Sequence, residues 1–154
     1  MTTDDPDPPS ATLRVSVTDG RGRSKAAPGL SGWLCRVAPR AARGDVVVAL
    51  VGDRKMRSLN RRFRGVDRVT DVLAFPADRE VPAVGARRCL GDIVIATGRA
   101  ARQARRAGLT ETQERRRLVL HGLLHLLGYD HERDDGRMTQ MERRLRRRGG
   151  LPPD

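Results

Sequence analysis

The sequence is poor in several residue types, and these shortages narrow the possible functions. Aromatic residues make up only 3% of the 154 positions. The longest unbroken apolar run is Val46 to Val51, far short of the ~20 residues that a membrane-spanning helix needs. The sequence opens with MTTDDPDPPS, which is acidic where a secretory signal would be basic and then apolar. We therefore expect a cytoplasmic protein with no membrane partner.

Cysteine and lysine are also scarce. Cys35 and Cys89 lie far apart and form no CxxC pair, so we expect reduced, buried thiols rather than a disulfide framework. Of the 31 basic residues only Lys25 and Lys55 are lysines, and the net charge is +12. A chain this basic attracts polyanions, and nucleic acid is the first candidate. The alternative is a GC-rich genome that uses arginine for any cation, so a single arginine carries little information.

Apolar periodicity predicts alternating strands and helices. Strands are expected at Leu13–Val17, Val46–Val51, Val72–Phe75 and Ile93–Ala96. The second of these is β-branched and continuous, as in a central strand covered on both faces. Helices are expected around Leu30–Val37, Met56–Phe63, Ala100–Ala107, Glu111–Leu127 and Met138–Leu145, the last with Arg143, Arg144, Arg146, Arg147 and Arg148 facing outward.

The order of these elements predicts an α/β (α+β) fold. It is a single mixed β-sheet of about four strands packed with about five helices. We expect residues 1–10 to be a disordered acidic tail, residues 11–148 to form one domain, and residues 149–154 to be a flexible C-terminal tail.

The only three histidines lie together in the segment HGLLHLLGYDH, which begins at His121. His121 and His125 are about one helical turn apart, so both imidazoles project from one face at the end of a central apolar helix. Gly128 suits a left-handed helix end, after which the chain can double back to bring His131 to the same point. Three neutral imidazoles with one open position are typical of a catalytic zinc site.

The alternative is three structural histidines. Two imidazoles buried without partners among leucines would cost ~1–3 kcal/mol each, whereas a shared metal removes that cost. The same spacing occurs in metzincin peptidases, H-E-x-x-H-x-x-G-x-x-H. Their glutamate activates the zinc-bound water, but this chain has Gly122 at that position. We expect Gly122 to leave room beside the metal for a bulky substrate or a backbone approach.

The histidine segment closely resembles the signature of the YbeY family, the metal-dependent endoribonucleases of ribosomal RNA maturation. The resemblance covers about residues 44 to 147. Three further segments match the family pattern in the same order: Leu59-Asn60-x-x-Phe63-Arg64-Gly65, then Thr70-Asp71-Val72-Leu73-Ala74-Phe75-Pro76, then Leu90-Gly91-Asp92-Ile93-Val94-Ile95. Ala74 departs from the family, where serine is usual.

The resemblance implies that residues 11–148 form a YbeY-like metallohydrolase domain. It implies one Zn²⁺ or other divalent metal per chain, held by His121, His125 and His131, with Arg64 as a catalytic residue across the cleft. The implied activity is that of a single-strand-specific endoribonuclease in 16S rRNA 3′-end maturation and ribosome quality control. The implied partners are the 16S rRNA precursor, the small ribosomal subunit, ribosomal proteins and a ribosome-associated GTPase.

For each candidate residue of these segments, a chemical role is weighed against a structural role. Arg64 would stabilise charge on an attacked phosphate. For Asp71 and Asp92 we favour hydrogen bonds at strand entry over substrate contacts. Asp130 could orient an imidazole or stabilise a turn. The run Arg143–Arg148 suits either RNA phosphate or a solvated helix face.

Two other functions fit the same residues. One is a non-catalytic, RNA-binding ribosome-assembly factor whose metal is structural. The other, less favoured because of Gly122, is a metzincin-like peptidase. For the endoribonuclease the base is expected to be the metal hydroxide, and the attacking group is either water or the neighbouring 2′-hydroxyl, which would explain a preference for RNA.

Overall fold

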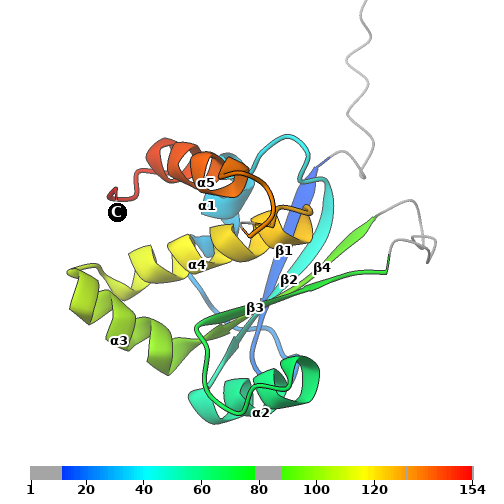
Figure 1. Ribbon diagram of the computed structural model, residues 1–154, viewed down its shortest axis with the longest axis vertical. Helices are drawn as coiled ribbons and strands as arrows, with labels where there is room; N and C mark the ends of the chain where they lie inside the picture. The colour runs from blue at the N-terminus through cyan, green and yellow to red at the C-terminus, as the bar shows by residue number, and fades with distance from the viewer. Residues whose placement is uncertain (1–11, 79–87, 131, 154) are drawn as a thin grey trace, which may run out of the picture.

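The structure is a computed structural model that describes residues 12–78, 88–130 and 132–153 (Figure 1). The predicted acidic tail at 1–10 and the third histidine, His131, lie outside these residues. Within them, no helix is both long enough and apolar enough to cross a membrane.

A four-stranded mixed sheet forms the centre of the fold, as predicted. Its strands are β1 (Leu13–Thr18), β2 (Gly44–Val51), β3 (Val72–Pro76) and β4 (Cys89–Ala96). They are arranged in the order β1-β2-β4-β3. The neighbours β1, β2 and β4 are parallel, and β3 pairs antiparallel with β4. This places β3 at one edge, next to the strand that enters the helical half of the chain.

Five helices pack on the two faces of this sheet, also as predicted. They are α1 (Leu30–Val37), α2 (Asp53–Arg64), α3 (Thr97–Ala107), α4 (Glu111–Leu126) and α5 (Arg137–Arg148). The main core joins α1, α4 and α5 to one sheet face, and a smaller cluster joins α2 to the other (Figure 1). Side chains of β4 alternate between them, with Ile93 and Ile95 in the main core and Val94 and Ala96 in the smaller cluster.

Strand β2 is central, but only one of its faces is fully covered. Val46, Val48 and Leu50 are buried in the main core, whereas Val47 and Ala49 on the other face are half-buried. The expectation of complete cover on both faces was therefore wrong, because α2 shields only part of that second face.

Several side chains lie differently from their predicted places. Phe63, an apolar residue of the periodic pattern that predicted α2 and so expected to face the core, is 57% exposed, whereas the polar Asn60 is only 4% exposed. Both cysteines are exposed. Arg146, expected to face outward from α5, is buried. Arg146 is buried because it pairs with Glu142, an interaction that apolar periodicity does not reveal.

The chain remains packed after α5. The indole nitrogen of Trp33 donates a hydrogen bond to the carbonyl of Gly149 at 2.9 Å. Leu151 is only 8% exposed and belongs to the main core. Residues 149–151 therefore differ from the flexible tail that the sequence suggested.

Gly122 brings α4 close to the sheet. A Cβ atom at this position would lie 2.7 Å from Cγ2 of Ile93 in β4, closer than such atoms normally approach. The space into which a side chain at position 122 would extend is thus filled by Ile93, so the glycine permits a close approach of strand and helix. Gly122 also lines the cleft described below, and whether a substrate uses the room beside it stays a prediction. A glutamate here, as in metzincins, would be driven into the strand.

This contact predicts the effect of Gly122→Ala. Overpacking a core typically costs ~1–3 kcal/mol, against a gain of up to ~1 kcal/mol in helix propensity. We expect the free energy of unfolding to fall by about 1 kcal/mol or more, measured by urea denaturation. The control is Gly32→Ala on the exposed side of α1, where the nearest neighbour is a flexible arginine tip and a small gain in stability is expected. Equal effects at the two glycines would contradict the packing argument.

Candidate active site

A cleft of about 600 Å³ contains most of the residues that the sequence motifs single out. It lies where the ends of α2 and α4 approach β3, whose residues Val72, Ala74 and Pro76 line it. Three of the four motif segments contribute residues to its lining, and the Leu90–Ile95 segment does not. The lining includes Arg64, Thr70, Asp71, Ala74, His121, His125 and Tyr129. Segments far apart in the sequence therefore share one cavity.

Helix α4 carries the two described histidines. It begins with a capping box in which the Thr110 side chain and the Gln113 side chain each bond the other's backbone NH. It ends at Leu126 and is followed by Gly128, whose φ of 97° is left-handed and whose NH donates to the carbonyl of His125. His121 and His125 are both half-buried, and their Nε2 atoms lie 3.1 Å apart. The predicted helix end at Gly128 is confirmed.

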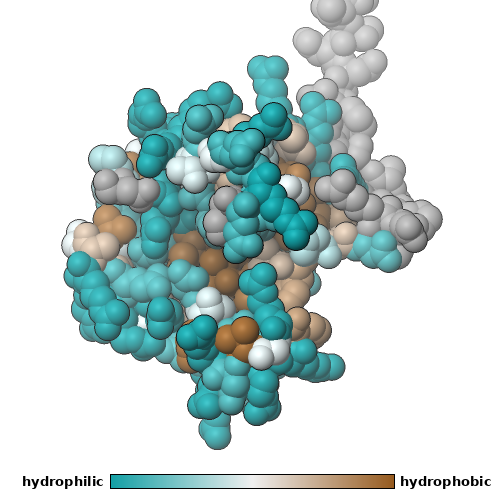
Figure 2. Space-filling view, viewed as in Figure 1, coloured by the Kyte–Doolittle hydropathy of each residue, from teal (hydrophilic) through white to brown (hydrophobic). Residues whose placement is uncertain are grey.

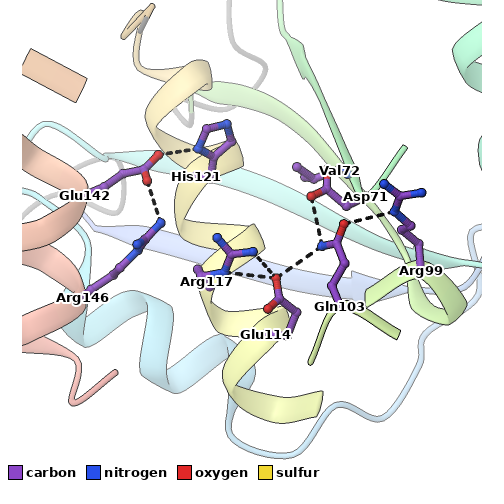
Figure 3. A network of polar contacts seen from close by, with 9 residues as sticks. All are labelled: Asp71, Val72, Arg99, Gln103, Glu114, Arg117, His121, Glu142 and Arg146. Carbon is purple, nitrogen blue, oxygen red and sulfur yellow. Dashed lines mark hydrogen bonds and ion pairs between the residues drawn. The ribbon is translucent and has the colours of Figure 1, made fainter. Parts of the chain in front are cut away.

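The other ring nitrogen of each histidine faces an acceptor. Nδ1 of His121 pairs with Oε1 of Glu142 on α5 (Figure 3). Nδ1 of His125 pairs with the carbonyl oxygen of Tyr129 at 3.1 Å. A carbonyl can only accept, and an ionised carboxylate can only accept, so both Nδ1 atoms carry the proton. In the neutral rings, both Nε2 atoms then turn lone pairs toward each other.

This donor set fits a divalent metal ion. Zinc–nitrogen bonds of about 2.0–2.1 Å at near-tetrahedral angles place two ligand nitrogens about 3.3 Å apart, close to the observed 3.1 Å. Hydrogen bonds from Nδ1 to a carboxylate or carbonyl are the usual support for metal-bound histidine. Among the described residues no third His, Cys, Asp or Glu completes a ligand cluster. The predicted third ligand, His131, lies outside that part of the chain.

Glu142 is itself held by Arg146 one turn further along α5. Arg146 donates to Oε2 of Glu142 at 2.9 Å, and both side chains are about nine-tenths buried (Figure 3). Burial raises the pKa of Glu142, whereas the hydrogen bond with His121, the charge that this ring carries when protonated, and the charge of Arg146 lower it. The lowering effects prevail, so the pKa lies below its ordinary value and the carboxylate is ionised as the acceptor for His121.

Arg64 is the last residue of α2, and three contacts fix the turn that follows it. Gly65 adopts a left-handed φ of 71° and caps the helix. The buried Asn60 side chain donates to the carbonyl of Arg68 at 2.9 Å. Phe63 packs edge-on against Phe75 of β3, with ring centroids 5.2 Å apart. The motif Asn60-x-x-Phe63-Arg64-Gly65 thus places the exposed Arg64 at the cleft.

A polar network connects Asp71 to the body of α4 (Figure 3). Asp71 accepts from the backbone NH of Val72 at 2.8 Å and from the Gln103 side chain of α3 at 3.2 Å. The same Gln103 amide lies 3.5 Å from Glu114, which is fully buried and also accepts from Arg117. Asp71 therefore makes the strand-entry bond that we favoured, and it also lines the cleft.

Two other aspartates make different contacts, and one of them, Asp130, also lines the cleft. Asp92 is within β4 and faces a separate apolar groove beside Val47 and Val94, where burial raises its pKa. Asp130 accepts from the NH of Glu132 at 3.0 Å, which is the turn-stabilising role. The carboxylate that orients an imidazole is instead Glu142.

Sequence reasoning missed Glu142, Arg146, Gln103 and Glu114. A signal for Glu142 was present, since it falls on the apolar face of α5 between Met138 and Leu145. A carboxylate on a buried helical face requires a partner. Nothing in the sequence indicated which element would supply that partner.

Comparison with known proteins gives consistent matches. A family described as "Endoribonuclease YbeY" matches residues 34–148. A relative of that name from Anaeromyxobacter sp. (strain Fw109-5) is 46% identical, over 91% of this chain and 73% of its own. Another from Solibacter usitatus is 45% identical, over 81% of this chain and 80% of its own. The solution structure of TM1509 from Thermotoga maritima matches with a TM-score of 0.57, 28% identity and 85% of both chains covered.

The Glu142–Arg146 pair predicts unequal effects of neighbouring arginines. Arg146→Ala leaves a buried carboxylate without its cation, and we expect the free energy of unfolding to fall by ~3–5 kcal/mol. Arg147→Ala removes the same charge from an exposed position, and we expect a change within ~0.5 kcal/mol. Urea denaturation of both variants tests this, and equal losses would show that the buried pair contributes nothing specific.

Proposed function

The chain belongs to the YbeY endoribonuclease family and is an endoribonuclease, and we propose that it hydrolyses single-stranded RNA in the cleft lined by Arg64, His121 and His125. The observation that supports this site is the convergence of two imidazole Nε2 atoms, each ring fixed at Nδ1, in the same cavity as an exposed guanidinium. The net charge of +12 favours a polyanionic substrate.

Under this proposal, His121, His125 and His131 hold one Zn²⁺ or similar divalent ion. When bound, such an ion lowers the pKa of a bound water and polarises a phosphate oxygen. Glu142 keeps the proton of His121 on Nδ1, which leaves Nε2 available as a ligand. Arg146 keeps Glu142 ionised and in place.

Arg64 acts on the phosphate directly. Its guanidinium donates charge-assisted hydrogen bonds to the phosphate oxygens, whose negative charge increases as the nucleophile attacks. The exposed position of Arg64 at the end of α2 leaves its donors accessible to substrate. Asp71, held by Val72 and Gln103, is a carboxylate acceptor in the same cleft.

We further propose that the physiological substrate is the 3′ end of the 16S rRNA precursor on the small ribosomal subunit. The resemblance of the four motif segments to the YbeY pattern supports this, as does the basic character of the chain. Cytoplasmic localisation, ribosome quality control, and contacts with ribosomal proteins and a ribosome-associated GTPase belong to the same proposal.

The test is cleavage of an end-labelled RNA that spans the small-subunit rRNA 3′ precursor junction. We expect zinc-loaded wild type to cut it, and Arg64→Ala to lower kcat by about 100- to 1000-fold because one donor to the developing charge is lost. Arg61→Ala is the matched control on the same helix, since Arg61 is exposed and does not line the cleft. Equal losses in the two variants would leave Arg64 without a chemical role.

Metal removal separates the enzyme from the assembly-factor alternative. The main core consists of apolar residues of α1, α4, α5 and the sheet and does not include the histidines. We therefore expect chelation to abolish cleavage while circular dichroism still reports a folded protein. Unfolding on chelation, together with RNA binding but no cleavage by wild type, would establish a structural metal. Hydrolysis of casein would instead favour the peptidase.

A further inference from the structure

A second hollow, lined mainly by arginines, lies along α5. Its volume is about 650 Å³. Four arginines line it, namely Arg137, Arg143, Arg144 and Arg147, and Tyr129 and Met141 lie at its sides. The described part of its lining contains no carboxylate. We call it the α5 groove.

The arginines of α5 divide between two faces of the helix. Arg146 is buried and paired with Glu142. Those of the α5 groove are exposed, and within the described residues none forms an ion pair with a carboxylate. Figure 2 shows hydrophilic side chains gathered over this part of the molecule. The outward arginines therefore form a concentrated positive surface without ion pairs in the part of the chain that the structure describes.

The α5 groove adjoins the candidate active site. Tyr129 lines both the cleft and the groove, and its carbonyl is the acceptor for His125. On the other side, Arg143 and Arg147 also line a smaller hollow of about 370 Å³ together with Leu151 and Pro153. Arg143 and Arg147 thus occupy the middle of a continuous path that leads away from the cleft.

We propose that the α5 groove binds the sugar-phosphate backbone of the single-stranded RNA that flanks the scissile phosphate. This inference rests on the proposed function. Guanidinium groups pair with phosphate oxygens through two parallel hydrogen bonds, and unpaired exposed arginines are free to do so. A single strand can turn at Tyr129 from the cleft into the groove, whereas a stiff duplex resists such a bend.

The chemistry of the groove also indicates what it recognises. Tyr129 is its one aromatic side chain among the described lining residues, so it offers a single stacking surface for a base. Recognition along the groove is therefore through phosphates and independent of base sequence. The 12-residue α5 is about 18 Å long, which spans roughly five nucleotides at the stacked spacing of about 3.4 Å and fewer when the strand is extended.

The experiment compares two double variants of the full-length, zinc-loaded protein. Arg143→Gln/Arg147→Gln removes two charges from the α5 groove. Arg105→Gln/Arg106→Gln is the matched control, because these arginines are exposed at the end of α3 and line neither the cleft nor the groove. Kd is measured by fluorescence anisotropy for labelled unstructured RNAs of about 4 and about 16 nucleotides over a range of salt concentrations. Circular dichroism checks that both variants are folded.

For the long RNA at low salt, we expect the groove variant to bind about tenfold more weakly than the control variant. The slope of log Kd against log salt should fall by about 1.4, since each lost phosphate contact on a single strand contributes about 0.7. For the short RNA, which the cleft can accommodate, the two variants should differ by less than about twofold. Base composition of the long RNA should have little effect.

Other outcomes would overturn the proposal. Equal affinities of the groove variant and the control for the long RNA would show that the groove does not bind RNA. Equal weakening for both RNA lengths would show that the arginines act on the cleft rather than on the flanking strand. Displacement of the long RNA from the groove by poly-glutamate at matched charge would assign the groove to an acidic protein. Failure of wild type to cleave either RNA would contradict the proposed function itself, while the binding comparison would still decide the role of the groove.

Discussion

The close packing of α4 on β4 determines where the functional groups of this protein lie. Gly122 allows the helix to approach until Ile93 occupies the space that any side chain would fill. The adjacent residue His121 is then turned toward the cleft, as is His125 one turn later. A helix displaced from the sheet would separate the imidazoles both from Arg64 on α2 and from Asp71 at the start of β3. The apolar core thus sets the geometry of a polar site.

Polar contacts complete that geometry from two directions. From α5, Glu142 and Arg146 hold the ring of His121. From α3, Gln103 connects Asp71 at the cleft with the buried Glu114 of α4. Buried charges are unfavourable unless they are paired and hydrogen-bonded, so each network stabilises one arrangement of helices over others in which its carboxylate would lack a partner. Helices that are distant in the sequence are thereby fixed around the same cavity.

The sequence predicted the fold more completely than the site. Apolar periodicity was sufficient to place each helix and strand of the described residues near its observed position. It placed Phe63 inward and Arg146 outward, and both are reversed, because periodicity cannot distinguish a true core position from one at the margin of a helix face. The histidine spacing and the motif around Arg64 indicated the cleft residues, whereas Glu142 and Gln103 depend on how α5 and α3 dock. The packing of one helix against another depends on contacts between distant segments, and a pattern of neighbouring residues carries little information about such contacts. The third histidine, His131, stays a prediction.

The hydrogen bond between His121 and Glu142 also affects the order in which the cleft is assembled during synthesis of the chain. Protein chains are synthesised from the N-terminus, and segments made earlier can begin to fold first. Both imidazoles of α4 are therefore made before the carboxylate that orients one of them, because that carboxylate belongs to α5. A nascent chain that has folded only as far as Tyr129 holds the ring of His121 without its acceptor. The arrival of α5 is the step that supplies the acceptor of His121, so the geometry of the cleft depends on a helix that is made after the residues that line it.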